Sequence, residues 1–427
     1  MKRFGLALVN KGLETAAKDN ILEILDDDKH DKDKSERTFH VIDGAVLFSI
    51  DGYPELCRLS YLSQSINRLF YVVDKIKFDD YDDLLNKFSI MLKDDDISKI
   101  YPLISSCTTF RVKSLVEDKE LKDYSMEIEQ NVGESLFEHF KDVTKDSSDS
   151  SDFSDIKLLL KVNLRDPELV FYIFIKDSTA YFCIDFSGDI SKRDYKIFNS
   201  SMSLKGTTAF GVLKLAGYSP KDHILNIFCN SGTLEIEAAL YANDVPVRYY
   251  NKNFPFMRLK IQDDKMQSDD SGSIDWGKFF SKIDKKMSDK KLPITASDPL
   301  LKNITAAKKN AKIAGCEKFI EFRRIDTDWL DLKFEEKSID KMMTFIPGSS
   351  KHKNDRSLQK LFKEFFYQAE YILKDSGMLS ILCLRKDLLL DISKEHFRLL
   401  REEEFYSGEQ QMAVLIFKKI KITGEKF

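Results

Sequence analysis

The sequence lacks the long apolar segments and the cysteine spacings that mark several common protein classes. No run of 18 or more apolar residues occurs, so we expect no membrane-spanning helix and no membrane partner. The first residues, MKRFGLALVNKGLE, reach charged positions too early for a secretion signal. The six cysteines include no C-x-x-C pair and lie near no histidine pair, which predicts buried free thiols rather than a zinc site or a disulfide framework. These absences predict a cytoplasmic protein that holds no metal.

An excess of positive charge is missing too. The net charge of the 427 residues is −4 at pH 7, which by itself does not favour a nucleic-acid partner. Acidic stretches lie at 26–34 and 146–155, and the remaining chain is rich in lysine, so a local basic surface stays compatible with the sequence. A hydrophobic content of 42% can supply the cores of two or three domains.

The two best-known glycine-rich phosphate loops are also absent, since neither G-x-x-x-x-G-K-[ST] nor G-x-G-x-x-G occurs. The chain has instead one buried strand, one turn and one helix at 223–240. An apolar run from Ile224 to Phe228 predicts the strand, and Gly232 supplies a turn with little steric hindrance before the helix. This arrangement favours a nucleoside-like ligand at the carboxyl end of a parallel sheet. An ordinary strand-to-helix connection is the alternative.

Two acidic residues follow the next two predicted strands. Asp298 ends the strand at 293–298, and Asp326 follows the strand at 319–326. A carboxylate at such a strand end can accept hydrogen bonds from both hydroxyls of a ribose. Both acids would otherwise be solvent-facing loop residues, but their position at successive strand ends favours ligand contact.

The turn resembles the first ligand-binding motif of S-adenosylmethionine-dependent RNA methyltransferases, which reads D-P-[FM]-C-G-S-G-T-x-x-x-E-A-A. The chain departs from it at Asn226, Ile227 and Asn230, and it matches at Phe228, Cys229, Ser231, Gly232, Thr233, Glu237, Ala238 and Ala239. Because asparagine tolerates a left-handed backbone, the turn is expected to survive. The resemblance implies S-adenosyl-L-methionine as cofactor, with Asp326 accepting from the adenine amine. The implied cofactor-binding residues are Asn226, Phe228, Cys229, Asn230, Ser231, Gly232, Thr233, Asp298 and Asp326.

The front half carries two further units. Residues 1–95 have the strand, helix, two strands, helix and strand of a ferredoxin-like unit. Residues 96–190 resemble THUMP domains, which in this family help to hold the acceptor end of tRNA. The matching residues are Phe110, Arg111, Val112, Lys113, Val162, Leu164, Pro167, Leu169, Val170, Asp185, Ser187, Gly188, Lys192, Arg193 and Tyr195.

This resemblance predicts a surface for tRNA. Cationic side chains can neutralise phosphates, and Tyr195 can stack on a base. The predicted RNA-binding residues are Arg111, Lys113, Lys192, Arg193, Tyr195 and Lys196. The alternative is that the strand lysines form an ordinary solvent-facing surface.

The predicted fold class is α/β. A ferredoxin-like domain (1–95) and a THUMP domain (96–190), both α+β, precede a linker (191–205). A Rossmann-like methyltransferase domain with a mostly parallel sheet follows at 206–427.

The catalytic position is altered. In the family the fourth strand ends in [ND]-[PL]-P-[YF], whose polar side chain orients the weakly nucleophilic guanine N2 and whose aromatic ring stacks on the extruded base. The chain has Phe345, Ile346, Pro347 and Gly348 there, and only Pro347 matches. Since a phenyl ring accepts no such hydrogen bond, the substitute acceptors are Thr344, Ser349 or the Ile346 carbonyl, while Phe345 is left for stacking.

Two hypotheses follow from the sequence. The first is a monomeric tRNA methyltransferase that acts on guanine N2 in the acceptor stem. The second is a methyltransferase-like RNA-binding or partner protein that has lost turnover, as the changes at Phe345 and Gly348 suggest.

Overall fold

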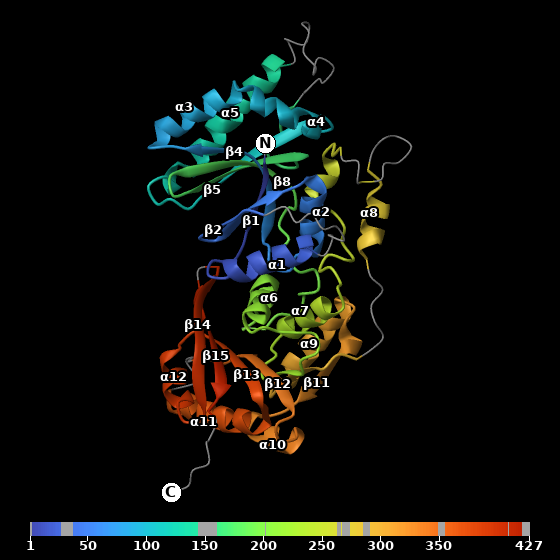
Figure 1. The fold of residues 1–427 in the computed structure, drawn as a ribbon, viewed down its shortest axis with the longest axis vertical. Helices are drawn as coiled ribbons and strands as arrows, with labels where there is room; N and C mark the ends of the chain where they lie inside the picture. The colour runs from blue at the N-terminus through green and yellow to red at the C-terminus, as the bar shows by residue number, and fades with distance from the viewer. Residues whose placement is uncertain are drawn as a thin grey trace.

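The computed structural model describes residues 2–26, 37–143, 160–200, 202–262, 266, 274–284, 291–348, 355–408 and 410–420. The acidic segments 27–34 and 146–155 and the predicted acceptor Ser349 lie outside these residues. The chain forms two halves along its longest axis, each built on its own β-sheet (Figure 1).

The N-terminal half contains an eight-stranded sheet in the order β2-β3-β1-β4-β8-β7-β5-β6. The strands and helices occur in the order predicted for the two front units. Strand β4 pairs with β8 from Phe70–Asp185 to Lys77–Thr179, so both units share one continuous sheet. The elements are β1 (Arg3–Leu8), α1 (Glu14–Asp26), β2 (Phe39–Ile42), β3 (Ala45–Ile50), α2 (Tyr53–Leu62), β4 (Arg68–Lys77), α3 (Tyr81–Leu92), α4 (Tyr101–Ile104), β5 (Thr109–Val116), α5 (Ser125–Val143), β6 (Lys161–Val162), β7 (Leu169–Lys176) and β8 (Thr179–Asp185).

The C-terminal half contains a seven-stranded sheet in the order β11-β10-β9-β12-β13-β15-β14, in which β9 to β13 pair in parallel and β15 is antiparallel to both neighbours. The predicted mostly parallel, Rossmann-like fold is therefore confirmed. The elements are α6 (Gly206–Leu215), β9 (Ile224–Asn226), α7 (Thr233–Ala242), β10 (Ile294–Asp298), α9 (Leu301–Ile313), β11 (Ile320–Arg324), α10 (Leu330–Lys333), β12 (Ile339–Phe345), α11 (Asp355–Ile372), β13 (Leu373–Cys383), α12 (Asp387–Ser393), β14 (Phe397–Ser407) and β15 (Gln410–Lys419).

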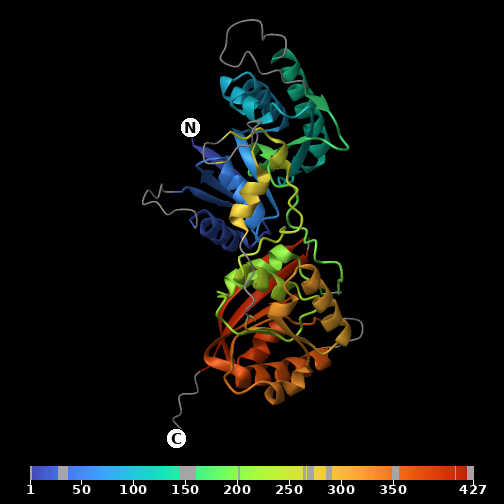
Figure 2. The same ribbon diagram turned by 90° about the vertical axis from the view of Figure 1, so that its right-hand side faces the viewer.

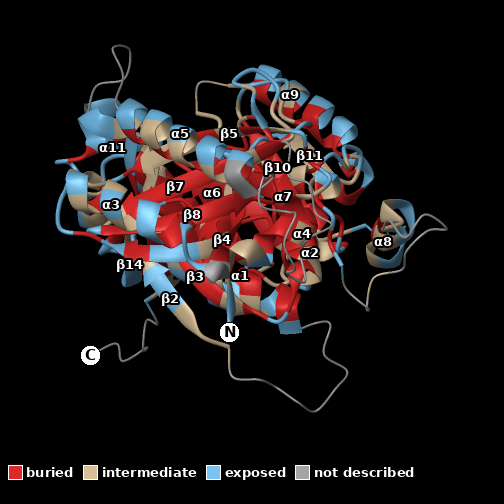
Figure 3. Cartoon of the chain, turned by 90° about the horizontal axis from the view of Figure 1, so that it is seen from above, coloured by how far each residue is buried: buried red, intermediate tan, exposed pale blue. Residues whose placement is uncertain are grey.

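Helices cover both faces of this second sheet. Apolar residues of α6, α7 and α9 form one buried cluster with one face, and those of α10, α11 and α12 form a second cluster with the other. The strands carry most of the burial, whereas α9 and α11 turn exposed faces outward (Figure 3). Two-sided covering explains why the predicted strands read as nearly continuous apolar runs.

A segment between α7 and β10 leaves the C-terminal half and packs against the N-terminal half (Figure 2). It includes helix α8 (Trp276–Ile283), whose Phe280 ring lies 4.7 Å from the Tyr61 ring of α2. Phe254 and Phe256 are buried in the same hydrophobic cluster. The two halves are thus joined by packing as well as by the chain.

The six cysteines are all buried, as predicted, and carry free thiols. Among the described residues, no helix is long and apolar enough to cross a membrane. In the same part of the chain, no group of three or more histidine, cysteine, aspartate or glutamate side chains is arranged to hold a metal ion.

Candidate functional site

The turn between β9 and α7 has the predicted geometry. Asn230 has φ = 51° and Gly232 has φ = 77°, both in the left-handed region. The Gly232 amide donates to the Cys229 carbonyl (2.8 Å) and closes the bend before the first turn of α7. Asparagine in place of the first glycine of the motif therefore leaves the turn intact, because its side chain tolerates this backbone better than most.

Gly232 serves helix packing in addition to the turn. A Cβ atom at this position would lie 2.8 Å from the Cβ of Ala307 on α9, closer than side chains tolerate. From the sequence, the absent side chain is expected to leave space for a ligand. The structure instead shows α9 approaching the turn at this point.

Asp298 joins the end of β10 to the turn. Its carboxylate accepts from the amides of Asn230 (3.1 Å) and Leu300 (2.9 Å), and from the Asn303 side chain (3.1 Å to each oxygen). The side chain is buried, and burial raises its pKa above the usual range, although these donors act in the opposite direction. Asp298 thus fastens the turn, and its carboxylate already accepts from three residues of the chain.

Asp326 lies at the same edge of the sheet. Strand β11 pairs with β10 in the register Asp298–Arg324, so Asp326 follows two residues beyond the strand end. Its side chain is exposed, unlike that of Asp298. The sequence therefore correctly grouped the turn and the two acids, but only Asp326 presents an open carboxylate.

The remaining predicted cofactor residues are buried: Asn226, Phe228, Cys229, Ser231 and Thr233. The Asn226 side chain accepts from the Phe228 amide (3.0 Å). Burial raises the pKa of the Cys229 thiol well above its usual range, which makes this cysteine a packing residue rather than a nucleophile.

A linker segment whose role is not evident from the sequence crosses this turn. Ser203 hydrogen-bonds Ser231, and the Asn310 side chain of α9 donates to the carbonyls of both Ser231 and Phe198 (2.9 Å each). Asn310 is a buried polar residue on the apolar side of α9, and that position is the only sequence signal for its role.

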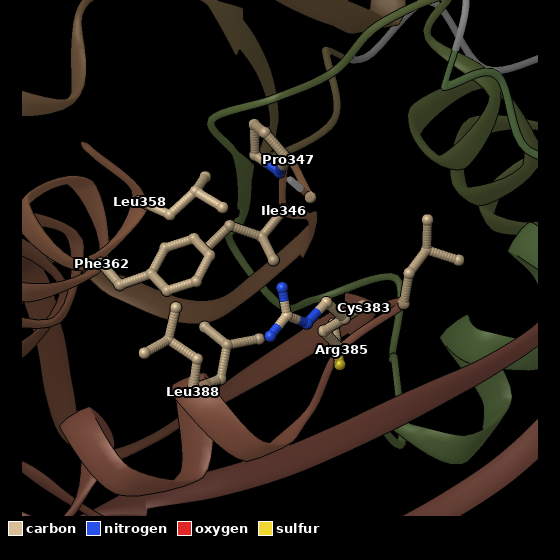
Figure 4. Close-up of a pocket in the computed structure, with 10 residues that line it drawn as sticks. Ile346, Pro347, Leu358, Phe362, Cys383, Arg385 and Leu388 are labelled. Atoms are coloured by element: carbon tan, nitrogen blue, oxygen red, sulfur yellow. The ribbon is translucent and has the colours of Figure 1, made fainter. Parts of the chain in front are cut away.

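At the end of β12, the described residues around the predicted catalytic position enclose almost no space. Phe345 is 7% exposed and belongs to the hydrophobic cluster on the α7 side, so it is not free to stack on a base. Ile346 is buried on the other side of the sheet. Pro347 and Gly348 line a cavity of about 10 Å³ with Phe362 and other side chains (Figure 4), which holds one water at most.

Thr344 is buried and its hydroxyl has no hydrogen-bond partner among the described residues. Its burial closes it to a substrate. Of the three acceptors proposed from the sequence, the Ile346 carbonyl remains within the described residues, and Ser349 lies outside them.

The predicted contact with RNA is wrong for two residues. Arg193 and Tyr195 are buried between the halves, where the Arg193 Nε atom and the Tyr195 hydroxyl donate to one Glu237 oxygen (2.7 and 2.6 Å). Neither side chain can reach a phosphate or a base. Glu237 lies 44 positions after Arg193 and 42 positions after Tyr195, so the local sequence does not reveal these contacts.

The other predicted RNA-binding residues differ in access. The Lys192 side chain is 81% exposed and lies 3.7 Å from Asp189, whereas the Lys196 ammonium donates to the Leu204 carbonyl. Burial lowers the pKa of Lys196. Arg111 and Lys113 point from the same side of β5, and burial together with the Arg111 charge lowers the pKa of Lys113. Lys192, Arg111 and Lys113 remain candidates for phosphate contact.

Comparison with protein families decides the class of the C-terminal half. The family of RMKL-like methyltransferase domains, UPF0020, matches residues 193–412. The chain belongs to this methyltransferase family. Membership confirms the methyltransferase resemblance drawn from residues 226–239.

Individual relatives extend the likeness over the whole chain. A tRNA (guanine(6)-N2)-methyltransferase of Methanocaldococcus jannaschii is 25% identical over 374 residues, which cover 85% of this chain and 87% of the relative. The crystal structure of TrmN from Thermus thermophilus has a TM-score of 0.65 at 19% identity and covers 98% of this chain and 100% of that one. The structure of SMU.472 complexed with SAH has a TM-score of 0.74 at 17% identity and covers 99% of both chains. These structural likenesses show that the fold is shared from end to end.

In this methyltransferase family member, one buried group at the turn is consistent with a cationic cofactor. Both carboxylate oxygens of Glu235 lack a hydrogen-bond partner within the described residues. A sulfonium nucleoside carries a positive charge that suits such a carboxylate, and Asp326 offers an open acceptor at the sheet edge. The residues present therefore fit S-adenosylmethionine.

Proposed function

We propose that this protein transfers a methyl group from S-adenosylmethionine to guanine N2 in the acceptor stem of tRNA. The observation that carries the proposal is the hydrogen bond from the Asn230 amide to Asp298, which closes a left-handed turn at the carboxyl edge of the sheet. Ligands of open α/β sheets bind at this edge, which supports a cofactor site here in a chain of a methyltransferase family.

The residues of the chain hold and orient the reactants. S-adenosylmethionine, when bound, supplies the methyl group. Asp326 would accept from the adenine amine, and the turn at 229–232 would help to hold the cofactor. We assign orientation of the guanine amine to the backbone carbonyl of Ile346, because Phe345 has no side-chain acceptor and the Thr344 hydroxyl is buried. Water takes the proton that the amine loses after transfer, so no side-chain base is required.

The N-terminal half is the proposed tRNA-binding part. We keep the division into a ferredoxin-like domain (1–95), a THUMP domain (96–190), a linker (191–205) and the methyltransferase domain (206–427). Arg111, Lys113 and Lys192 are the proposed phosphate contacts at the acceptor end. We also propose that the protein is a cytoplasmic monomer. The name of the M. jannaschii relative supports guanine N2 as the methylated atom.

Calorimetry and mass spectrometry test this proposal together. We expect heat of binding for S-adenosylmethionine, lower affinity in Asp326→Ala, and N2-methylguanosine in tRNA incubated with protein and cofactor. Absence of both binding heat and methylated nucleoside across tRNAs of the source organism would refute the proposal. Asp328→Asn, an exposed acid two positions from Asp326, is the matched control and should bind as the unaltered protein does.

A second function is favoured by one observation, the cavity of about 10 Å³ at the catalytic position. It fits a tRNA-binding or partner protein without turnover. Introducing Phe345→Asn with Gly348→Tyr separates the two, because a Cβ at Gly348 would meet only the Leu384 side chain, at 3.9 Å. Methylation that appears only in the double variant would favour this second function, provided that its thermal unfolding shows a folded protein.

A further inference from the structure

Helix α7 contains a buried acid with no cation beside it in the part of the chain that the structure describes. Glu235 lies in the first turn of the helix and is 1% exposed. Neither of its carboxylate oxygens has a hydrogen-bond partner among the described residues. Buried polar groups are nearly always hydrogen-bonded, so an orphan of this kind indicates an absent partner.

The next acid of the same helix shows what a satisfied carboxylate looks like. Glu237 is also buried, but it accepts from Arg193 (2.7 Å), Tyr195 (2.6 Å) and Gln64 (2.7 Å). Glu235 has the Asn226 side chain and a helix amide near it, but neither forms a hydrogen bond of normal geometry with its oxygens. Burial by itself does not account for the difference.

The location of Glu235 links it to the turn. Its carboxylate lies beside the Asn226 side chain at the end of β9 and interacts electrostatically with Asp298, and it also acts on the Cys229 thiol. Asn226 occupies the position at which the methyltransferase motif has an acid. The strand end thus has an amide in place of the family's acid, and a carboxylate stands close to it on the adjoining helix.

The electrostatics around Glu235 would suit a cation placed beside it. Burial raises its pKa to about 8, and the Asp298 charge acts in the same direction, while the Asn226 side chain and the helix amide oppose it. None of these groups is a cation. A carboxyl group in this setting is mostly protonated at pH 7, and a positive charge placed nearby would favour its ionised form.

We propose that Glu235 supplies the negative charge that is missing at Asn226, and that it releases its proton to solvent when the sulfonium cofactor occupies the turn. The inference rests on the proposed function, because the cation is that of S-adenosylmethionine. Glu235 is a positioning residue, since it acts through the field at the turn rather than by touching the reacting atoms. The contrary reading is a permanently neutral acid that only fills space.

Calorimetric titration of the full-length protein with S-adenosylmethionine at pH 7, repeated in buffers of different ionisation enthalpy, counts the protons released on binding. We expect the unaltered protein to release between about half a proton and one proton per cofactor. Glu235→Gln and Glu235→Leu should release almost none and bind several-fold more weakly. Glu317→Gln, which removes an exposed acid, should match the unaltered protein.

The outcomes separate this inference from the proposed function. If the unaltered protein binds the cofactor and both Glu235 variants release as many protons as it does, the inference is overturned and the proposed function stands. If the unaltered protein binds without proton release, the inference is likewise overturned. If it does not bind at all, both fail. Thermal unfolding checks that the two variants are folded. Because glutamine is polar and leucine is apolar, a packing defect caused by one of them would not be shared by the other.

Discussion

The Arg193 guanidinium and the Glu237 carboxylate form an ion pair between the two halves of the molecule, with both side chains 0% exposed and 2.7 Å between Nε and Oε1. Arg193 also donates to the carbonyls of Ile190 (2.6 Å) and Gln64 (2.7 Å). Gly206 packs so closely that a Cβ there would lie 2.4 Å from the Arg193 Nε atom. The pair thus ties the linker and the N-terminal half to the helix that carries the turn.

Removing one member of this pair should destabilise the fold. Glu237→Gln leaves the Arg193 charge buried without its counter-ion, and breaking a buried pair typically costs about 3–5 kcal/mol. We expect a fall of this order in the free energy of unfolding, measured by urea denaturation. Lys192→Ala changes the exposed neighbouring residue and should stay within about 0.5 kcal/mol. A loss below about 1 kcal/mol in Glu237→Gln would show that the pair is not a structural tie.

Substitution of Gly232 should cost more than backbone strain alone. Gly44 and Gly232 have similar φ values, 80° and 77°, but a Cβ at Gly44 would meet nothing within 4 Å. Gly44→Ala should therefore cost only the left-handed backbone penalty of about 1–2 kcal/mol. Gly232→Ala adds the contact with Ala307 and should cost about 1–3 kcal/mol more. Equal losses in the two variants, measured by thermal unfolding, would mean that α9 yields without strain.

The stability of the protein should depend on Glu235 in a defined pH window. Burial raises the pKa of this carboxyl to about 8 from a usual value near 4.5, so the folded state keeps a proton that the unfolded state releases. Stability conferred by the protonated group therefore falls as pH rises from 4.5, and the loss is complete above pH 8. Relative to Glu235→Gln, the unaltered protein should lose roughly 4 kcal/mol between pH 5 and pH 8. The assignment is contradicted if the difference in free energy of unfolding between the unaltered protein and Glu235→Gln is the same at pH 5 and pH 8.

Phosphate contacts should be visible in the salt dependence of tRNA binding. Lys113→Ala and Lys192→Ala should each weaken binding and reduce the slope of log affinity against log salt by about 1. Lys394→Ala serves as the control, since this exposed lysine of the C-terminal half lies 3.1 Å from Asp391. If the slopes of both variants equal that of the control, these two lysines do not contact phosphates of the tRNA. Fluorescence anisotropy with labelled tRNA at several salt concentrations gives the slopes.

The sequence was sufficient where the controlling interactions are local. The apolar run from Ile224 and the left-handed residues Asn230 and Gly232 determine the strand and turn through their own backbone preferences, and both appear as predicted. The placement of Asp298 and Asp326 at one sheet edge follows from the parallel pairing of their strands. Hence the class of fold and the outline of the site were predictable.

Interactions between distant segments could not be read in the same way. Arg193 is a charged residue in a polar stretch and resembles a surface residue until Glu237, 44 positions away, is brought against it. The β4–β8 pairing that makes one sheet of two predicted units is equally non-local. The orphan status of Glu235 depends on which side of α7 faces the sheet, and the apolar composition of that helix gives no clear periodic signal.

The central claim is that the chain transfers a methyl group to guanine N2 of tRNA, and labelled methyl transfer tests it most directly. The protein is incubated with unmodified tRNA and S-adenosylmethionine that carries a trideuterated methyl group, and the nucleosides are analysed by mass spectrometry. We predict N2-methylguanosine with the deuterium label, at one position in the acceptor stem. A protein that binds both cofactor and tRNA yet leaves every guanosine unlabelled would contradict the claim.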